Sequence, residues 1–271
     1  MIISASRRTD IPAFFGEWFM ERLREQFVNV PNPMNPKQVS HISLAAGDVD
    51  CFVFWTKNPK NFLPCLKQID KSGFRYYFQF TLNPYEKNLE PALPAKAELL
   101  DTFIELSRII GSEKVIWRYD PVIINSSYSV KFHEASFNAF CRKLETYTKK
   151  CVLSFVDNYP FLKEKFAVLG IREIEPDKII EIAKSFSSIA KQHGIELASC
   201  AEKTGLQEYG IIPNRCIDAE FVNRLFGLDL RHKKDPAQRC ECCCSLSRDI
   251  GAYNTCKYGC VYCYAERGKR Q

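Results

Sequence analysis

The chain has 271 residues, 46% of them hydrophobic and 13% aromatic, with 38 Lys and Arg against 32 Asp and Glu. This composition excludes disordered and fibrous proteins and suits one large domain or two ordinary ones. No apolar run approaches the roughly 18 residues of a membrane span, and the N-terminus lacks the order of a signal peptide, so we expect a cytoplasmic protein. The net charge of +6 permits an anionic ligand and does not require nucleic acid.

Six short runs of β-branched and aromatic residues each end in polar residues, often with a proline, which is typical of strands. Several of these runs are apolar at both alternating positions, as strands buried in a parallel sheet are. In chain order, the predicted strands cover residues 2–5, 52–55, 76–80, 115–119, 152–156 and 196–199.

Apolar residues three and four positions apart predict a helix after each of the first five strands. Residues 37–44 have an alternation that fits an edge strand or one arm of a hairpin. The predicted helices are centred on residues 15–23, 62–69, 99–110, 137–147 and 179–190.

The alternation of strands and helices predicts an α/β fold with a parallel sheet. No Gly-x-Gly-x-x-Gly turn follows the first strand, which favours a βα barrel, complete or partial, over a dinucleotide-binding sheet. We expect residues 1–235 to form this barrel-like domain. Residues 236–271 are expected to form a cysteine-rich tail of the same structural unit, folded over the mouth of the barrel.

Charged and polar residues follow the predicted strands, and in a parallel barrel such positions line the mouth where active sites lie. Four basic residues in this set suit a carboxylate or phosphate ligand, and the acidic residues suit ribose hydroxyls or an amine. The alternative is that these residues turn the chain or pair with one another. The candidate binding residues are Arg7, Arg8, Asp10, Lys57, Gln79, Thr81, Arg118, Asp120, Asp157 and Glu202.

Thirteen cysteines are present, and seven of them lie in the last 32 residues. An odd number of cysteines in a large chain from a reducing compartment argues against a disulfide framework and indicates metal. Four others fall on apolar runs or helix faces, where we expect small buried hydrophobic side chains: Cys51, Cys65, Cys141 and Cys151.

Cys256, Cys260 and Cys263 form a C-x3-C-x2-C motif. Three thiolates at this spacing can bind three irons of a [4Fe–4S] cluster and leave the fourth iron open to a ligand, whereas structural zinc prefers four ligands. Gly259 permits a tight turn between them, and Tyr262, together with the tyrosine that follows Cys263, can shield the cluster.

This motif, with an aromatic residue before the third cysteine, resembles the cluster motif of the radical S-adenosyl-L-methionine enzymes. The resemblance implies a βα barrel with a [4Fe–4S] cluster at its mouth. S-adenosylmethionine then binds the open iron and is cleaved reductively to a 5′-deoxyadenosyl radical. In that superfamily the motif usually follows the first strand, whereas here the tail must fold back over the mouth, and no Gly-Gly-Glu-like stretch is present.

The whole chain also resembles an uncharacterised bacterial family, catalogued as a domain of unknown function, that carries this tail. No reaction is known for that family. The stretches that carry the resemblance are residues 6–12, 54–59, 118–121 and 249–256.

Cys200, Cys216, Cys242 and Cys244 form a second candidate set, which would complete a second [4Fe–4S] cluster or bind zinc. Two further thiols make the choice of ligands in the tail ambiguous: Cys240 and Cys243.

Three functions follow from these patterns. The first is an enzyme that cleaves S-adenosylmethionine reductively and acts on an anionic small molecule, with electrons from a donor such as a ferredoxin or flavodoxin. The second is a non-radical iron–sulfur protein that transfers electrons or senses redox state. The third is a zinc-stapled binding module, for which nucleic acid is a conceivable partner.

Overall fold

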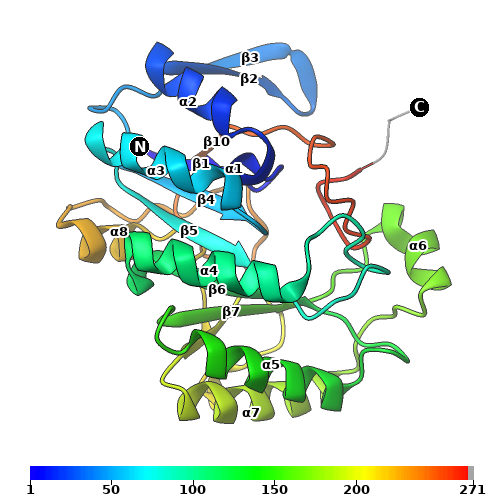
Figure 1. Cartoon of the computed structure of the whole chain (residues 1–271). Helices are drawn as coiled ribbons and strands as arrows, with labels where there is room; N and C mark the ends of the chain where they lie inside the picture. The colour runs from blue at the N-terminus through cyan, green and yellow to red at the C-terminus, as the bar shows by residue number, and fades with distance from the viewer. Residues whose placement is uncertain (268–271) are drawn as a thin grey trace.

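A parallel β-sheet forms the centre of the protein in a computed structural model that describes residues 1–267 (Figure 1). Within these residues the strand order is β10-β1-β4-β5-β6-β7-β8-β9, and each neighbouring pair is parallel. The predicted α/β fold with a parallel sheet is therefore confirmed. The strands are β1 (Ile2–Ala5), β4 (Cys51–Thr56), β5 (Tyr76–Thr81), β6 (Val115–Val122), β7 (Lys150–Phe155), β8 (Glu196–Ser199), β9 (Ile212–Pro213) and β10 (Arg248–Asp249).

The main helices lie together on one face of the sheet, as Figure 1 shows for α3, α4, α5 and α7. From β1 to β9 the chain steps across the sheet in one direction, and right-handed crossovers then place successive helices on the same side. No helix of the described residues is long and apolar enough to cross a membrane. The helices are α1 (Ile11–Phe14), α2 (Gly16–Glu25), α3 (Leu63–Lys71), α4 (Lys96–Ile110), α5 (Val130–Leu144), α6 (Lys163–Val168), α7 (Pro176–Gln192) and α8 (Ala219–Phe226), with short 3-10 turns at Lys60–Phe62, Ser112–Lys114, Pro160–Leu162 and Gln207–Tyr209.

A strand order that advances in one direction is typical of a barrel wall, whereas a doubly wound sheet reverses direction near its centre. The strand pairs of the described residues do not include one between β9 and β10, the two ends of the sheet. Closure of the barrel therefore stays a prediction.

Aromatic side chains fill the layer between the sheet and its helices. Phe19 of α2 packs edge-on against Phe52 and Phe54, with ring centroids 5.2 Å from each. Phe137 of α5 stacks on Phe186 of α7 at 3.9 Å. Each such pair adds about 0.5–1.5 kcal/mol to the free energy gained by burying its apolar area.

The opposite face of the sheet is apolar near the start of the strands and polar near their carboxyl ends. The Tyr77 hydroxyl donates a hydrogen bond of 2.8 Å to the Cys216 carbonyl. Gln79 lies on this face two residues beyond Tyr77 in β5, and Arg118 lies on it two residues beyond Ile116 in β6. Helix α8 therefore covers the apolar part of this face and leaves uncovered the polar part at the carboxyl edge. It packs against strand side chains that include Val53, Tyr77, Ile116 and Val152.

The structure places one predicted strand outside the main sheet and contains several short elements that were not predicted from the sequence. The arm predicted at residues 37–44 is strand β3 (Asn35–Ser43), which pairs antiparallel with β2 (Phe27–Asn32) in a separate two-stranded sheet. Strands β9 and β10 have two residues each, too few for any periodicity to be visible. Helices α6 and α8 have six and eight residues, which is scarcely two turns.

All thirteen cysteines lie in the described residues and are free thiols. Cys51, Cys141 and Cys151 are buried, as predicted, whereas Cys65 is only partly buried. These four positions are separate in the sequence from the two cysteine sets of the candidate site.

His133 of α5 is fully buried between the Tyr119 hydroxyl, 2.7 Å from Nδ1, and the Ile123 carbonyl, 2.8 Å from Nε2. Burial lowers the pKa of His133 to about 4 from its ordinary 6.5. Because only the unfolded state binds a proton here as the pH falls from about 6.5 towards 4, this residue should cost roughly 3 kcal/mol of stability across that window. Urea unfolding at pH 7 and pH 4 should show a smaller loss for His133→Gln than for wild type, and equal losses would contradict the prediction.

Candidate metal centre and the charged rim of the sheet

The C-terminal tail is held at the end of β1 by one carboxylate. Strand β10 extends the sheet beside β1, with Asp249 in register with Ser4. The Asp249 carboxylate accepts hydrogen bonds from the Ser4 hydroxyl at 2.8 Å, the Ser6 hydroxyl at 2.7 Å and the Arg7 backbone N–H at 2.8 Å. Beyond this point the tail runs along the carboxyl ends of the strands (Figure 1).

The tail passes so close to β1 that residue 251 has no room for a side chain. A Cβ on Gly251 would lie 2.5 Å from Ser6 Cβ and nearer still to Ser6 Oγ. Gly251→Ala should therefore lower the free energy of unfolding by about 1–3 kcal/mol, the usual cost of overpacking. The matched control is Gly47→Ala, where nothing lies within 4 Å of the added Cβ. Equal urea midpoints for the two variants would refute the close approach.

Cys256, Cys260 and Cys263 line one small hollow. Gly259, between the first two, has a φ of +63°, which favours glycine and turns the chain so that the thiols share the hollow. The hollow is also lined by Asn254, Ala265 and Glu266. The structure thus brings together the three thiols of the motif.

The motif is docked on the segment that follows β5. The Val261 N–H donates to the Leu89 carbonyl at 3.0 Å, and the Ala92 N–H donates to the Tyr258 carbonyl at 3.3 Å. The Tyr258 ring also packs on Phe14 of α1, with centroids 4.6 Å apart. These contacts fix the cysteine loop against both α1 and the loop after β5.

Burial raises the pKa of all three motif thiols, to about 11 for Cys256 and higher for Cys260. The charge of Lys57 opposes this effect at Cys260. Without a bound cation the thiols are therefore neutral at pH 7, and a metal that binds them must displace their protons.

Lys57 lies in a buried network beside the motif rather than free at the rim. Its Nζ donates to Glu90 at 2.8 Å and to the Tyr262 hydroxyl at 2.9 Å. Tyr262 also bonds to Glu90 and accepts from Asn83 at 3.1 Å, and Lys96 forms a second ion pair with Glu90. Tyr262, predicted as a shield, thus anchors the cysteine loop to the sheet.

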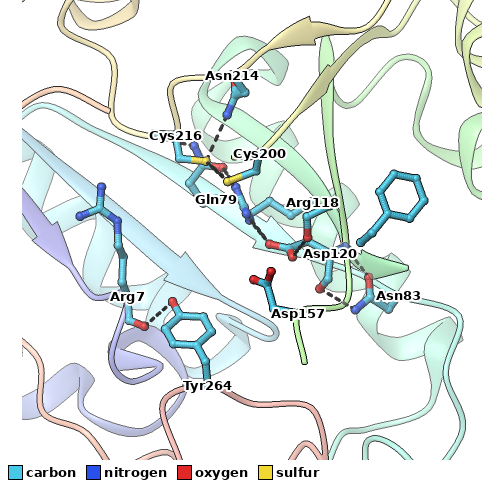
Figure 2. Close-up of polar contacts among 12 residues, drawn as sticks. Arg7, Gln79, Asn83, Arg118, Asp120, Asp157, Cys200, Asn214, Cys216 and Tyr264 are labelled. Atoms are coloured by element: carbon cyan, nitrogen blue, oxygen red, sulfur yellow. Dashed lines mark hydrogen bonds and ion pairs between the residues drawn. The ribbon is translucent and has the colours of Figure 1, made fainter. Parts of the chain in front are cut away.

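Arg118 and Asp120 meet at the end of β6 (Figure 2). Arg118 forms an ion pair with Asp120 and donates to Gln79 at 3.4 Å, and Asp120 also accepts from Ser154. The Gln79 amide donates to the Cys216 carbonyl at 2.8 Å. The structure therefore groups these three predicted rim residues and engages each with protein partners.

Arg7, Arg8 and Asp10 follow β1, as expected for the rim. Arg8 lies 3.8 Å from Asp249 and its guanidinium carbon is 5.4 Å from the Tyr253 ring. Asp10 caps α1 by accepting from the Ala13 N–H at 3.0 Å, and its other oxygen accepts from the Lys57 N–H at 2.7 Å. Asp10 is thus engaged by backbone donors.

The other predicted rim residues are spread along the same edge. Thr81 ends β5 in register with Arg118. Asp157 pairs with Arg239 of the tail at 2.6 Å, and Glu202 accepts from the Phe155 N–H at 2.9 Å.

The second cysteine set also comes together. Cys200 Sγ lies 3.3 Å from Cys216 Sγ (Figure 2). Cys216, Cys242 and Cys244 belong to one buried cluster, against which Cys200 packs. The other two tail thiols lie outside this cluster: Cys240 is exposed and Cys243 partly exposed.

In residues 1–267, no three His, Cys, Asp or Glu side chains are arranged to hold a metal ion. An iron–sulfur cluster binds its thiolates through different irons, so its ligands do not need to converge on a single ion. The chemistry of the two donor sets, thiols only, is that of such clusters.

Residues 2–265 match the model of a family described as domain of unknown function (DUF1848). The chain belongs to this family. No curated protein matches it. The DUF1848 match covers the sheet together with the tail, so both cysteine sets lie within this domain.

Sequence reasoning missed several site residues of the DUF1848 domain. Asn83 had a signal, because it follows a predicted strand, and it holds Asp120 by bonds of 2.8 Å to that residue's backbone N–H and carbonyl. Glu90 and Asn214 lie in loops with no pattern that marks them. Trp55 was assigned only to a strand, although its ring lies under two arginines.

Proposed function

We propose that this DUF1848 protein is an iron–sulfur enzyme of the radical S-adenosylmethionine type. The observation that supports this most directly is the shared hollow of Cys256, Cys260 and Cys263 at the carboxyl edge of a parallel sheet. This edge is where α/β proteins place their reacting groups.

The residues around the hollow suit a [4Fe–4S] cluster. Three thiolates would bind three irons and leave one open to a ligand. Lys57, whose charge acts on Cys260, would offset part of the negative charge. When bound, the reduced cluster supplies the electron that cleaves S-adenosylmethionine.

The chain's own residues would bind and orient the other groups. In this proposal Arg8 holds an anionic group, while Asp120, Asp157 and Glu202 contact ribose or amine groups. The substrate would be a small anion, and the electron donor a ferredoxin or flavodoxin. The proposal also includes a barrel that closes around the mouth and a cytoplasmic location, which would keep the thirteen thiols reduced.

Anaerobic purification followed by electron paramagnetic resonance tests the proposal. We expect a brown protein whose reduced signal changes when S-adenosylmethionine is added and which forms 5′-deoxyadenosine with dithionite. A colourless protein with stoichiometric zinc would overturn the proposal in favour of a zinc-stapled module. A brown protein whose signal ignores S-adenosylmethionine would instead identify an electron-transfer or redox-sensing protein.

A further inference from the structure

Four thiols from three separate segments meet beneath the rim, on the face of the sheet opposite the main helices. Cys200 follows β8, Cys216 precedes α8, and Cys242 and Cys244 precede β10. Cys216, Cys242 and Cys244 are buried in one cluster against which Cys200 packs, and the sulfur atoms of Cys200 and Cys216 lie 3.3 Å apart. Four cysteine thiols are the ligand set of a [4Fe–4S] cluster, in which each iron binds a different thiolate, so the thiols do not need to converge on one ion.

Protein donors surround the sulfur of Cys216. Arg118 Nη1 donates to it at 2.9 Å and Asn214 Nδ2 at 3.1 Å (Figure 2). The Ile217 backbone N–H donates to Cys244 Sγ at 3.4 Å. These donors favour negatively charged sulfur, because hydrogen bonds to an ionised acceptor are stronger than bonds to a neutral one.

Two more donors nearby have no acceptor. Arg7 Nη2 and Trp55 Nε1 are both buried and have no hydrogen-bond partner. The guanidinium carbons of Arg7 and Arg118 lie 5.4 and 5.0 Å from the Trp55 ring centroid. Buried donors normally have an acceptor. The unpaired donors of Arg7 and Trp55, together with those on Cys216, therefore point to an anionic group among the thiols.

We infer that Cys200, Cys216, Cys242 and Cys244 bind a second [4Fe–4S] cluster whose counter-ions are Arg7 and Arg118. A dicationic cluster core with four thiolates has two excess negative charges, and two guanidiniums balance them. Each thiol releases one proton to solvent as its sulfur binds iron. The inference does not rest on the proposed reaction, and it gives Arg7 a buried partner in place of a substrate anion.

Counting iron in anaerobically purified full-length variants tests the cluster. Wild type should contain about eight irons and eight sulfides per chain, and Cys216→Ala about four of each. The triple variant Cys256→Ala/Cys260→Ala/Cys263→Ala should also keep about four, because only the other set is removed. A triple variant without iron, or with zinc in its place, would overturn the inference, whether or not wild type cleaves S-adenosylmethionine.

A dithionite titration of the triple variant tests the counter-ions. Reduction adds a negative charge to the cluster, so Arg7→Gln should move its midpoint potential to a more negative value, and Arg7→Lys should restore most of the shift. The matched control is Arg8→Gln, which removes the same charge from a side chain that contacts Asp249 and Tyr253 instead. Equal shifts for Arg7→Gln and Arg8→Gln, or no shift for either, would refute the role of Arg7.

Discussion

Replacing Cys260 with alanine is expected to abolish reductive formation of 5′-deoxyadenosine and to remove about four irons per chain. Cys260 is the middle thiol of the motif and the buried one of the three, at 6% exposure. With only two thiolates left around the hollow, a cluster would lack the ligand set that leaves a single iron open. Product formation under dithionite, measured by chromatography, and iron content together check this prediction.

The control for this experiment is Cys65→Ala. Cys65 is a partly exposed thiol of α3 that belongs to neither cysteine set. This variant should keep wild-type iron content and turnover. Unchanged turnover in Cys260→Ala would show that the motif does not bind the catalytic cluster.

Replacing Glu90 with glutamine should lower the free energy of unfolding by about 3–5 kcal/mol. The Glu90 side chain is 1% exposed and forms ion pairs with Lys57 and Lys96. Burial alone would raise the pKa of Glu90, but the two lysines hold it below the ordinary 4.5. The neutral amide would leave two ammonium groups in a largely buried setting, and Tyr262 would lose its charged acceptor.

Urea unfolding of Glu90→Gln beside Glu98→Gln measures this effect. Glu98 also pairs with a lysine, Lys60, but both side chains are about half exposed, so this control should be nearly as stable as wild type. The contribution of Glu90 should be complete above about pH 4.5 and disappear as the pH falls through its lowered folded-state pKa. Similar losses in the two variants would show that the buried network contributes no more than a surface pair.

Local sequence patterns predicted the main elements of the fold well, because each is encoded within a few neighbouring residues. The apolar run before Arg118 became β6, and the apolar residues three and four positions apart in residues 99–110 became α4. The same local logic placed Arg118 and Asp120 at a carboxyl edge, since polar residues that follow parallel strands share one edge of the sheet. Elements of two residues, such as β10, could not be predicted because two residues are too few to show a periodic pattern.

The partners of the site residues depend on contacts between distant segments, which no local pattern encodes. Lys57 reads as a free cation at a strand end, yet its partner Glu90 lies 33 residues away and Tyr262 lies 205 away. Arg118 likewise has a local partner in Asp120 and a remote one in Cys216, 98 residues further along.

The sequence by itself therefore determined the α/β class, the concentration of thiols in the tail and the edge at which the charged residues lie. Only the tertiary structure decided which cations are already neutralised, which thiols meet, and that Arg7 and Trp55 keep buried donors without acceptors. Burial and charge pairing are properties of packing between segments. They depend on which distant segments meet, as when Glu90 reaches Lys57 or Cys216 reaches Arg118, and not on the residues that adjoin each position in the sequence.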